Sequence, residues 1–117
     1  MARDPIKILI VDDDEDVLIE LERLLEGEGY STASAWSGQE ALALSEKLQF
    51  DVLLVDEHLA NVNAHARFDE LVARQPNAFR FLMHSRKENT HLPTTQTAVC
   101  KWEHADVMAK IRNCLAA

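Results

Sequence analysis

The sequence contains little cysteine and no long apolar run. Only Cys100 and Cys114 carry thiols, and their spacing matches no metal-ligand pattern. A pair of this kind is typical of reduced thiols in a cytoplasmic protein. No apolar segment approaches the roughly 20 residues that span a bilayer, and no secretory signal precedes the first apolar run. We therefore expect a cytoplasmic protein that has no membrane among its partners.

Positive charge and glycine are also scarce. The chain has 12 lysines and arginines against 20 acidic residues, which gives a net charge of -8. That charge argues against nucleic acid as a direct partner and favours a metal ion or a basic protein surface. The chain has only three glycines, and no glycine-rich turn follows the first expected strand. A dinucleotide-binding fold is therefore disfavoured.

Apolar residues make up 47% of the 117 residues, so we expect 1–117 to form a single domain with its own core. Short apolar runs alternate with longer amphipathic ones. We predict strands at 6–11, 30–35, 51–55, 79–84 and 97–100, and helices at 15–26, 37–48, 64–75 and 103–115. This alternation indicates an α/β fold in which a doubly wound, five-stranded parallel sheet is covered on both faces.

Three acidic residues follow the ends of predicted strands. Asp12 and Asp13 come directly after the first strand, and Asp56 comes after the third. The carboxyl ends of parallel strands meet at one edge of a sheet, so we expect these side chains to lie close together. Carboxylates at close quarters repel one another unless a cation lies between them. Mg²⁺ prefers oxygen ligands and keeps waters that a phosphate oxygen can replace, so the sequence predicts a magnesium site here.

Two further side chains complete the pattern. Ser85 follows the fourth strand and offers a hydroxyl, and Lys101 follows the fifth strand and offers a cation. A carboxylate nucleophile, a metal, a hydroxyl and an ammonium are the groups that phosphoryl transfer to an aspartate requires. If the register of the fourth strand slips by one, His84 takes the place of Ser85. The pattern of a buried strand does not decide between them, although the order of residues favours Ser85.

Four stretches of the chain resemble the receiver domain of two-component response regulators, the CheY-like family. They are Lys7–Asp14 (KILIVDDD), Asp51–Asp56 (DVLLVD), Arg80–Ser85 (RFLMHS) and Val99–Lys101 (VCK). The resemblance covers nearly the whole chain and implies a flavodoxin-like sheet with strand order 2-1-3-4-5. It implies a signalling module and no enzyme beyond its own phosphorylation and dephosphorylation. The implied partner is a sensor histidine kinase or a phosphotransfer protein, whose phosphohistidine is the donor.

The resemblance also implies how a metal is held. Asp56 would be the phosphoacceptor and would bind Mg²⁺ directly together with Asp13, while Asp12 would act mainly through water. The backbone carbonyl of His58 would supply a further ligand. The side chain of His58 is either an exposed loop histidine or a group that tunes the access of water to the acyl phosphate.

The remaining roles concern the phosphoryl group. Ser85 would form a hydrogen bond to it and signal its presence. Lys101 would pair with Asp56 before phosphorylation and with the phosphoryl group afterwards. Trp36 and Trp102 are expected to be packing or rim residues with no chemical role.

The chain departs from the family pattern at several positions. Ala60 and Ala64 stand where the family usually has proline and glycine. Trp102 follows Lys101 where the family usually has proline, so we predict a trans peptide bond there, because a cis bond without proline costs several kcal/mol. Ala98 takes the place of the aromatic switch residue, so the rotation of an aromatic ring cannot report phosphorylation.

The largest departure is a short segment. Only 15 residues separate Ser85 from Lys101, which leaves room for about one helical turn beyond a strand and two connections. The family's fourth helix is therefore predicted to be missing or vestigial, with 86–96 forming a loop. We expect its loss to uncover part of the sheet near Phe81 and Met83, and an exposed apolar face usually marks an interface. A homodimer or another partner would then cover the face formed by the fourth strand, the fifth strand and the last helix.

Two other functions compete with the phosphoacceptor. The first is a pseudo-receiver, which has the same fold but acts as a constitutive interaction or dimerisation domain. The altered loops favour it, whereas the retained Asp12, Asp13, Asp56 and Lys101 oppose it. The second is an aspartate-nucleophile phosphohydrolase, which needs a second aspartate two residues after the nucleophile, where this chain has His58.

Overall fold

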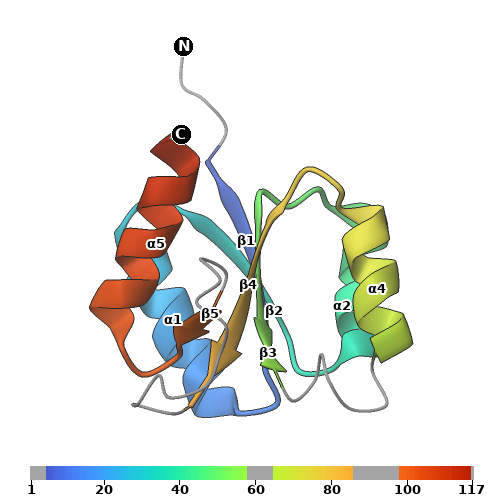
Figure 1. Cartoon of the computed structure of the whole chain (residues 1–117), viewed down its shortest axis with the longest axis horizontal. Coiled ribbons are helices and arrows are strands. Elements are labelled where there is room, and N and C mark those ends of the chain that lie inside the picture. Colours follow the sequence, from blue (N-terminus) through green and yellow to red (C-terminus); the bar gives the residue numbers. More distant parts are fainter. Residues whose placement is uncertain (1–4, 58–64, 86–97, 117) are drawn as a thin grey trace.

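The computed structural model describes residues 5–57, 65–85 and 98–116 (Figure 1). The strands in this part of the chain are β1 Lys7–Val11, β2 Ser31–Ala35, β3 Val52–Asp56, β4 Phe79–His84 and β5 Ala98–Cys100. The helices are α1 Glu15–Gly27, α2 Gly38–Lys47, α4 His65–Arg74 and α5 His104–Ala116. Each of these elements was predicted, and the observed ends lie within one residue of the expected ones.

All five strands run parallel in one sheet whose order is β2-β1-β3-β4-β5, which confirms the expected topology. The inner strands β1 and β3 consist largely of β-branched and leucine residues, and Ile8, Leu9 and Ile10 are fully buried. Strands that are buried on both faces need apolar side chains on both sides, which explains their continuous apolar runs.

Polar residues fix where α1 and α2 begin. Asp14 precedes α1, and its side chain accepts a hydrogen bond from the backbone N–H of Asp16. Ser37 precedes α2 in the same way and accepts from the N–H of Glu40 at 3.1 Å. Such caps satisfy N–H groups that have no partner within the helix. Gly29 follows α1 with a φ of 92°, a conformation that glycine adopts without strain.

Helices cover both faces of the sheet, with α1 and α5 on one side and α2 and α4 on the other (Figure 1). Two buried clusters follow this division. The α1/α5 cluster joins side chains of β1, β3 and β4 to Val17, Leu21, Val107 and Ile111 of the two helices. The α2/α4 cluster joins the opposite side chains of the same strands to residues such as Ala41 and Leu71.

The expectation of uncovered sheet near Phe81 and Met83 is wrong. Both side chains are buried in the α1/α5 cluster. Successive residues of a strand point to opposite faces, so Phe81 and Met83 share one face of the sheet, which is the face that α1 and α5 cover. The predicted loop at 86–96 and the substitutions Ala60 and Ala64 lie outside the described residues.

A buried glutamine that sequence analysis did not single out ties the α2 and α4 layer together. Gln75 lies just after α4, and its Oε1 accepts a hydrogen bond from the N–H of Phe50 at 2.9 Å. Its Nε2 donates to the carbonyl of Leu48 at 2.9 Å and to that of Ser45 at 3.3 Å. These bonds satisfy backbone groups at the end of α2 and before β3, which would otherwise be buried without partners.

Candidate functional site

Three strands bring a side chain each to the same edge of the sheet. Asp12 follows β1, Asp56 is the last residue of β3, and Lys101 follows β5. Backbone bonds hold two of these positions beyond the ends of their strands. The N–H of Asp12 donates to the carbonyl of Ala35 at 3.0 Å, and the N–H of Lys101 donates to that of His84 at 2.9 Å. The site is therefore tied to the sheet by backbone hydrogen bonds.

The ammonium of Lys101 lies between two buried carboxylates. Its Nζ is 2.6 Å from Oδ2 of Asp12 and 3.5 Å from Oδ1 of Asp56. All three residues are buried, with exposed fractions of 0% for Asp12, 3% for Asp56 and 7% for Lys101. The expected pairing of Lys101 with Asp56 is thus present as a charge contact, but the hydrogen bond of the lysine goes to Asp12.

Burial and charge shift the ionisation of this group in definite directions. Burial raises the pKa of Asp12, and the charge of Asp56 adds to this, although Lys101 and the N–H of Asp14 oppose it. Burial alone would lower the pKa of Lys101, but the hydrogen bond and charge of Asp12 and the charge of Asp56 outweigh it, so that pKa is raised. The lysine is therefore held in its charged form.

Asp13 completes a group that fits a metal ion. One carboxylate oxygen from each of Asp12, Asp13 and Asp56 lies within 4.8 Å of the others. Asp13 is exposed, while the other two are buried. Oδ1 of Asp56 is buried without a hydrogen-bond donor. A carboxylate oxygen left in this state, beside two further carboxylates, matches the oxygen ligands that Mg²⁺ requires.

The structure does not decide the roles of the other predicted site residues, Ser85, His84 and His58. Ser85 follows β4 and is exposed, and His84 is buried with an Nδ1 that has no hydrogen-bond partner. Met83 packs into the α1/α5 cluster, so alternation along β4 directs His84 to the opposite face. The assignment of the switch position to Ser85 stays a prediction. His58 lies outside the described residues.

Two further expectations, on the peptide bond after Lys101 and on the tryptophans, are confirmed. The described peptide bonds include no cis bond, so Lys101 and Trp102 are joined in trans as predicted. Trp36 and Trp102 are exposed by 68% and 45%, so they are rim residues and do not belong to the core. Sequence analysis did not foresee that Trp36 borders a cavity next to Asp13.

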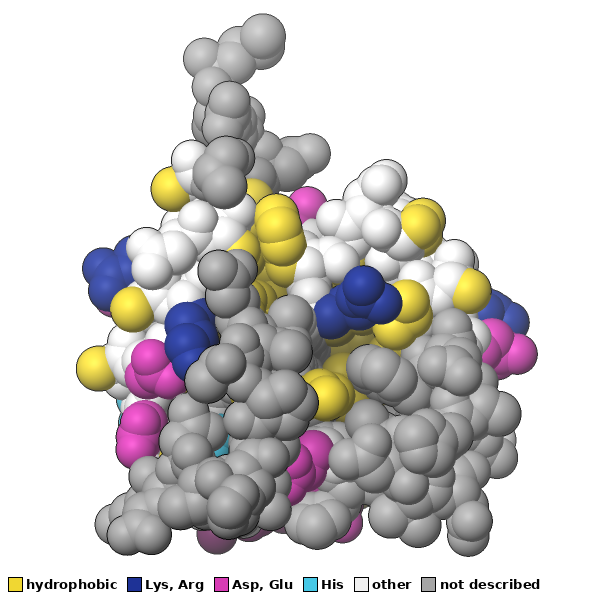
Figure 2. Space-filling view, viewed as in Figure 1, with side chains coloured by type: hydrophobic (Ala, Val, Ile, Leu, Met, Phe, Trp, Pro, Cys, Tyr) yellow, Lys and Arg dark blue, Asp and Glu magenta, His cyan; other side chains and the backbone are white. Residues whose placement is uncertain are grey.

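Charge on the surface is distributed unevenly. In Figure 2, acidic side chains lie mostly in the lower half of the view, toward the end at which β3 and β4 finish in Figure 1. An edge rich in carboxylates attracts cations and basic protein surfaces. In the part of the chain that the structure describes, no helix combines the length and apolar character needed to cross a bilayer.

A doubly wound parallel sheet with acids and a lysine at the carboxyl edge of its strands defines a class of α/β domains that bind ligands at that edge. The family model for the response regulator receiver domain matches residues 8–111. The chain belongs to this family. It is accordingly a receiver domain of two-component signalling and not an enzyme in the usual sense.

Curated relatives give a similar result over part of their length. The chain is 41% identical over 76 residues to the transcriptional regulatory protein ZraR of Salmonella typhimurium. These residues make up 65% of this chain but only 17% of that protein. It is 39% identical over 72 residues to a response regulator receiver protein of Anaeromyxobacter. Those residues make up 62% of this chain and 30% of that protein.

Solved structures agree on the fold. A receiver domain protein from Methanospirillum hungatei has a TM-score of 0.80 at 22% identity, with 97% of this chain and 95% of that chain covered. A response regulator from Burkholderia pseudomallei, solved with a phosphorylated aspartic acid, a calcium ion and citrate, has a TM-score of 0.63 at 24% identity. The match covers 92% of this chain and 55% of that one.

Proposed function

We propose that Asp56 accepts a phosphoryl group from the phosphohistidine of a sensor histidine kinase or a phosphotransfer protein. The observation that carries this proposal is the state of Asp56. Its carboxylate is buried, one oxygen has no hydrogen-bond donor, and the ammonium of Lys101 lies 3.5 Å away. Family membership supplies the kind of partner, and the phosphorylated aspartic acid in the Burkholderia pseudomallei structure is a precedent on the same fold.

The proposed metal is Mg²⁺, held directly by Asp13, Asp56 and the backbone carbonyl of His58. Both oxygens of Asp12 already have partners, since Oδ1 accepts from the N–H of Asp14 at 2.9 Å and Oδ2 accepts from Lys101. This favours a role for Asp12 through metal-bound water. When bound, the ion neutralises charge on the phosphoryl oxygens.

The transfer step needs few groups. A carboxylate oxygen of Asp56 attacks the phosphorus, the bond from phosphorus to the donor's imidazole nitrogen breaks, and an acyl phosphate forms while the donor histidine is released. Lys101 then pairs with the phosphoryl oxygens, and Ser85 donates a hydrogen bond to one of them. Because Lys101 is buried and held charged, it stabilises that negative charge in a region that excludes water.

Phosphorylation would then alter contacts with other proteins. Two free cysteines support a cytoplasmic location for this phosphoryl transfer.

A homodimer through β4, β5 and α5 stays part of the proposal, but Phe81 and Met83 no longer support it because α5 and its neighbours bury them. Light scattering across a range of concentrations tests it, and a monomer at all of them excludes it.

The decisive experiment is phosphorylation by acetyl phosphate with Mg²⁺, followed by intact mass. Wild type is expected to gain one phosphoryl group, and Asp56→Asn none. Asp51→Asn is a matched control, because Asp51 lies at the opposite end of β3, where it accepts a hydrogen bond from the N–H of Lys7. This control is expected to gain the group as wild type does.

The same experiment separates the pseudo-receiver from the phosphoacceptor. A pseudo-receiver gains no mass and gives no NMR shifts with beryllofluoride and Mg²⁺. Both results together would exclude phosphorylation and leave a constitutive interaction domain.

A further inference from the structure

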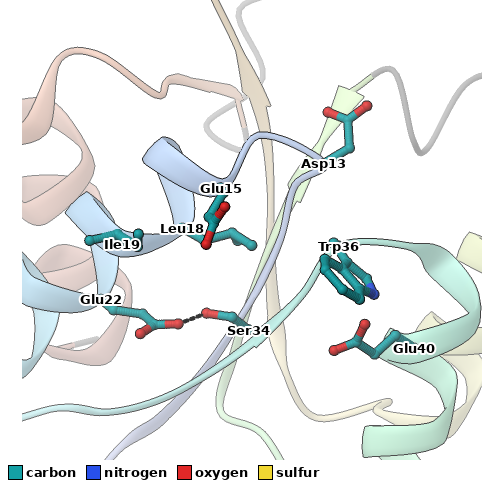
Figure 3. Close-up of a pocket in the computed structure, with 8 residues that line it drawn as sticks. All are labelled: Asp13, Glu15, Leu18, Ile19, Glu22, Ser34, Trp36 and Glu40. Carbon is teal, nitrogen blue, oxygen red and sulfur yellow. Dashed lines mark hydrogen bonds between the residues drawn. The ribbon is translucent and has the colours of Figure 1, made fainter.

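A cavity of about 270 Å³ opens beside the candidate site, between α1, the end of β2 and the start of α2 (Figure 3). Its lining combines two kinds of side chain. Carboxylates come from both helices and from the loop that holds the candidate metal ligands, and apolar groups come from α1 and from the residue after β2. The six that matter here are Asp13, Glu15 and Glu40, together with Leu18, Ile19 and Trp36.

The apolar side of this cavity is unusually exposed. Among the described residues, four large hydrophobic side chains are exposed, and two of them, Ile19 at 48% and Trp36 at 68%, border this cavity. In Figure 3 the indole of Trp36 stands across the cavity from Leu18, with Glu40 beside it. Exposed aromatic surface next to a hollow is typical of a site that a partner covers.

The charge in the cavity is of one sign. Its lining contains four carboxylates and no lysine or arginine among the described residues. One of the four, Glu22, accepts a hydrogen bond from the hydroxyl of Ser34, and burial raises its pKa. The lining also contains the carboxylates of Asp13, Glu15 and Glu40, so the cavity has the negative potential of a cation-binding site.

Glu15 and Glu40 favour an organic cation over a metal ion. Within the described residues, the group whose oxygens converge closely enough for a metal is Asp12, Asp13 and Asp56, and neither Glu15 nor Glu40 belongs to it. A guanidinium is planar, carries five N–H donors and stacks on indole rings. Its aliphatic stem also needs apolar surface, which Leu18 and Ile19 supply.

We propose that this cavity binds an arginine side chain of a protein partner, with the guanidinium stacked on Trp36 and paired with Glu15 and Glu40. A different protein is favoured over a second copy of this chain, because a second copy carries 20 acidic residues against 12 basic ones and is less suited to an acidic cavity. It is also favoured over a free small molecule, because the side chains of Ile19 and Trp36 leave apolar surface exposed at the cavity that a partner protein can cover. Arginine and tryptophan are both enriched at the energetic centres of protein interfaces.

The proposal does not depend on phosphorylation. The cavity shares Asp13 with the candidate metal site, so a partner docked there lies next to the edge at which phosphorylation is proposed. Arginine binding is tested in the absence of Mg²⁺ and of any phosphodonor. Its failure therefore leaves the role of Asp56 untouched, and the failure of phosphorylation leaves this site untouched.

The test uses the full ¹⁵N-labelled chain and a blocked tripeptide with a central arginine between two leucines. The matched probe is the same peptide with citrulline, which keeps the shape and removes the charge. Titration with the arginine peptide is expected to shift the indole N–H of Trp36 and the amides of Ser34 and Glu40. The citrulline peptide is expected to bind at least about threefold more weakly, because it lacks the cation–π and ion-pair contacts.

Variants locate the binding. Trp36→Ala and Glu40→Gln are each expected to weaken binding of the arginine peptide by about two- to fivefold. Their matched controls, Trp102→Ala and Glu20→Gln, make the same changes at two exposed residues outside the cavity and are expected to keep the wild-type Kd. Equal binding of both peptides, or equal losses in Glu20→Gln and Glu40→Gln, would mean unspecific attraction to an acidic protein and would overturn the proposal.

Discussion

Replacing Lys101 with methionine tests the electrostatic core of the candidate site. Methionine keeps much of the length and the apolar character of the lysine stem but removes the charge that lies 2.6 Å from Asp12 and 3.5 Å from Asp56. Two buried carboxylates then face each other with no cation between them. We expect the free energy of unfolding in the absence of metal to fall, and Mg²⁺ to restore much of the loss.

The distances set the size of the effect. At an effective dielectric constant of about 20, the attraction of Lys101 to the two carboxylates is roughly 6 and 5 kcal/mol before the cost of burial is counted. Burial cancels part of this, and breaking a buried pair by removing one partner typically costs about 3–5 kcal/mol. Since domains of this size are stable by about 5–15 kcal/mol, Lys101→Met should remove a large share of the total.

Urea unfolding with and without excess Mg²⁺ measures both parts of the prediction. The matched control is Lys110→Met, because Lys110 makes a more exposed ion pair with Asp106 at 3.2 Å and a hydrogen bond to the carbonyl of Ala98. It should lose only about 1–2 kcal/mol, with no special response to Mg²⁺. If Lys101→Met loses no more than this control, or if Mg²⁺ stabilises both variants equally, the site does not hold its charges as we describe.

Three further predictions concern ionisation, packing and capping. The pKa of Lys101 is raised in the folded state, so its contribution to stability is complete below the unfolded value of 10.5 and is lost as pH rises through the folded value. Wild type should therefore show a loss of stability in strong alkali that Lys101→Met lacks, and identical pH profiles would contradict this. Gln75→Ala should cost about 2–4 kcal/mol in urea unfolding, because it leaves buried backbone groups without partners, whereas the exposed Gln49→Ala should change little. Ser37→Ala should cost about 1 kcal/mol through loss of the α2 cap, and an unchanged melting temperature would rule out that role.

Much of the fold could be predicted from the chain because local signals agreed with one another. Apolar runs, the cap residues Asp14 and Ser37, and the alternation of strands with helices placed each described element within a residue of its observed ends. The directions of side chains were harder to predict. A buried strand is apolar on both faces, so its sequence does not say which side chains meet α5, and this is why the expectation for Phe81 and Met83 failed.

The candidate site also has features that the sequence predicted and features that it did not. That Asp12, Asp13, Asp56 and Lys101 share one edge follows from their positions after parallel strands, and the structure confirms it. The preference of Lys101 for Asp12 over Asp56 was not predictable, because it depends on ångström-scale placement across three strands. The cavity at Trp36 was missed for the same reason, since its walls come from α1, β2 and α2.

The sequence by itself determined the class of fold, the order of the elements and the set of acids that gather with a lysine, because these depend on periodicity and on where each strand ends. Only the tertiary structure decided which carboxylate takes the lysine's hydrogen bond, which face buries each strand residue, and where an acidic hollow opens beside an exposed indole. Those features depend on distances between segments far apart in the chain, and such distances exist only once the helices have packed against the sheet.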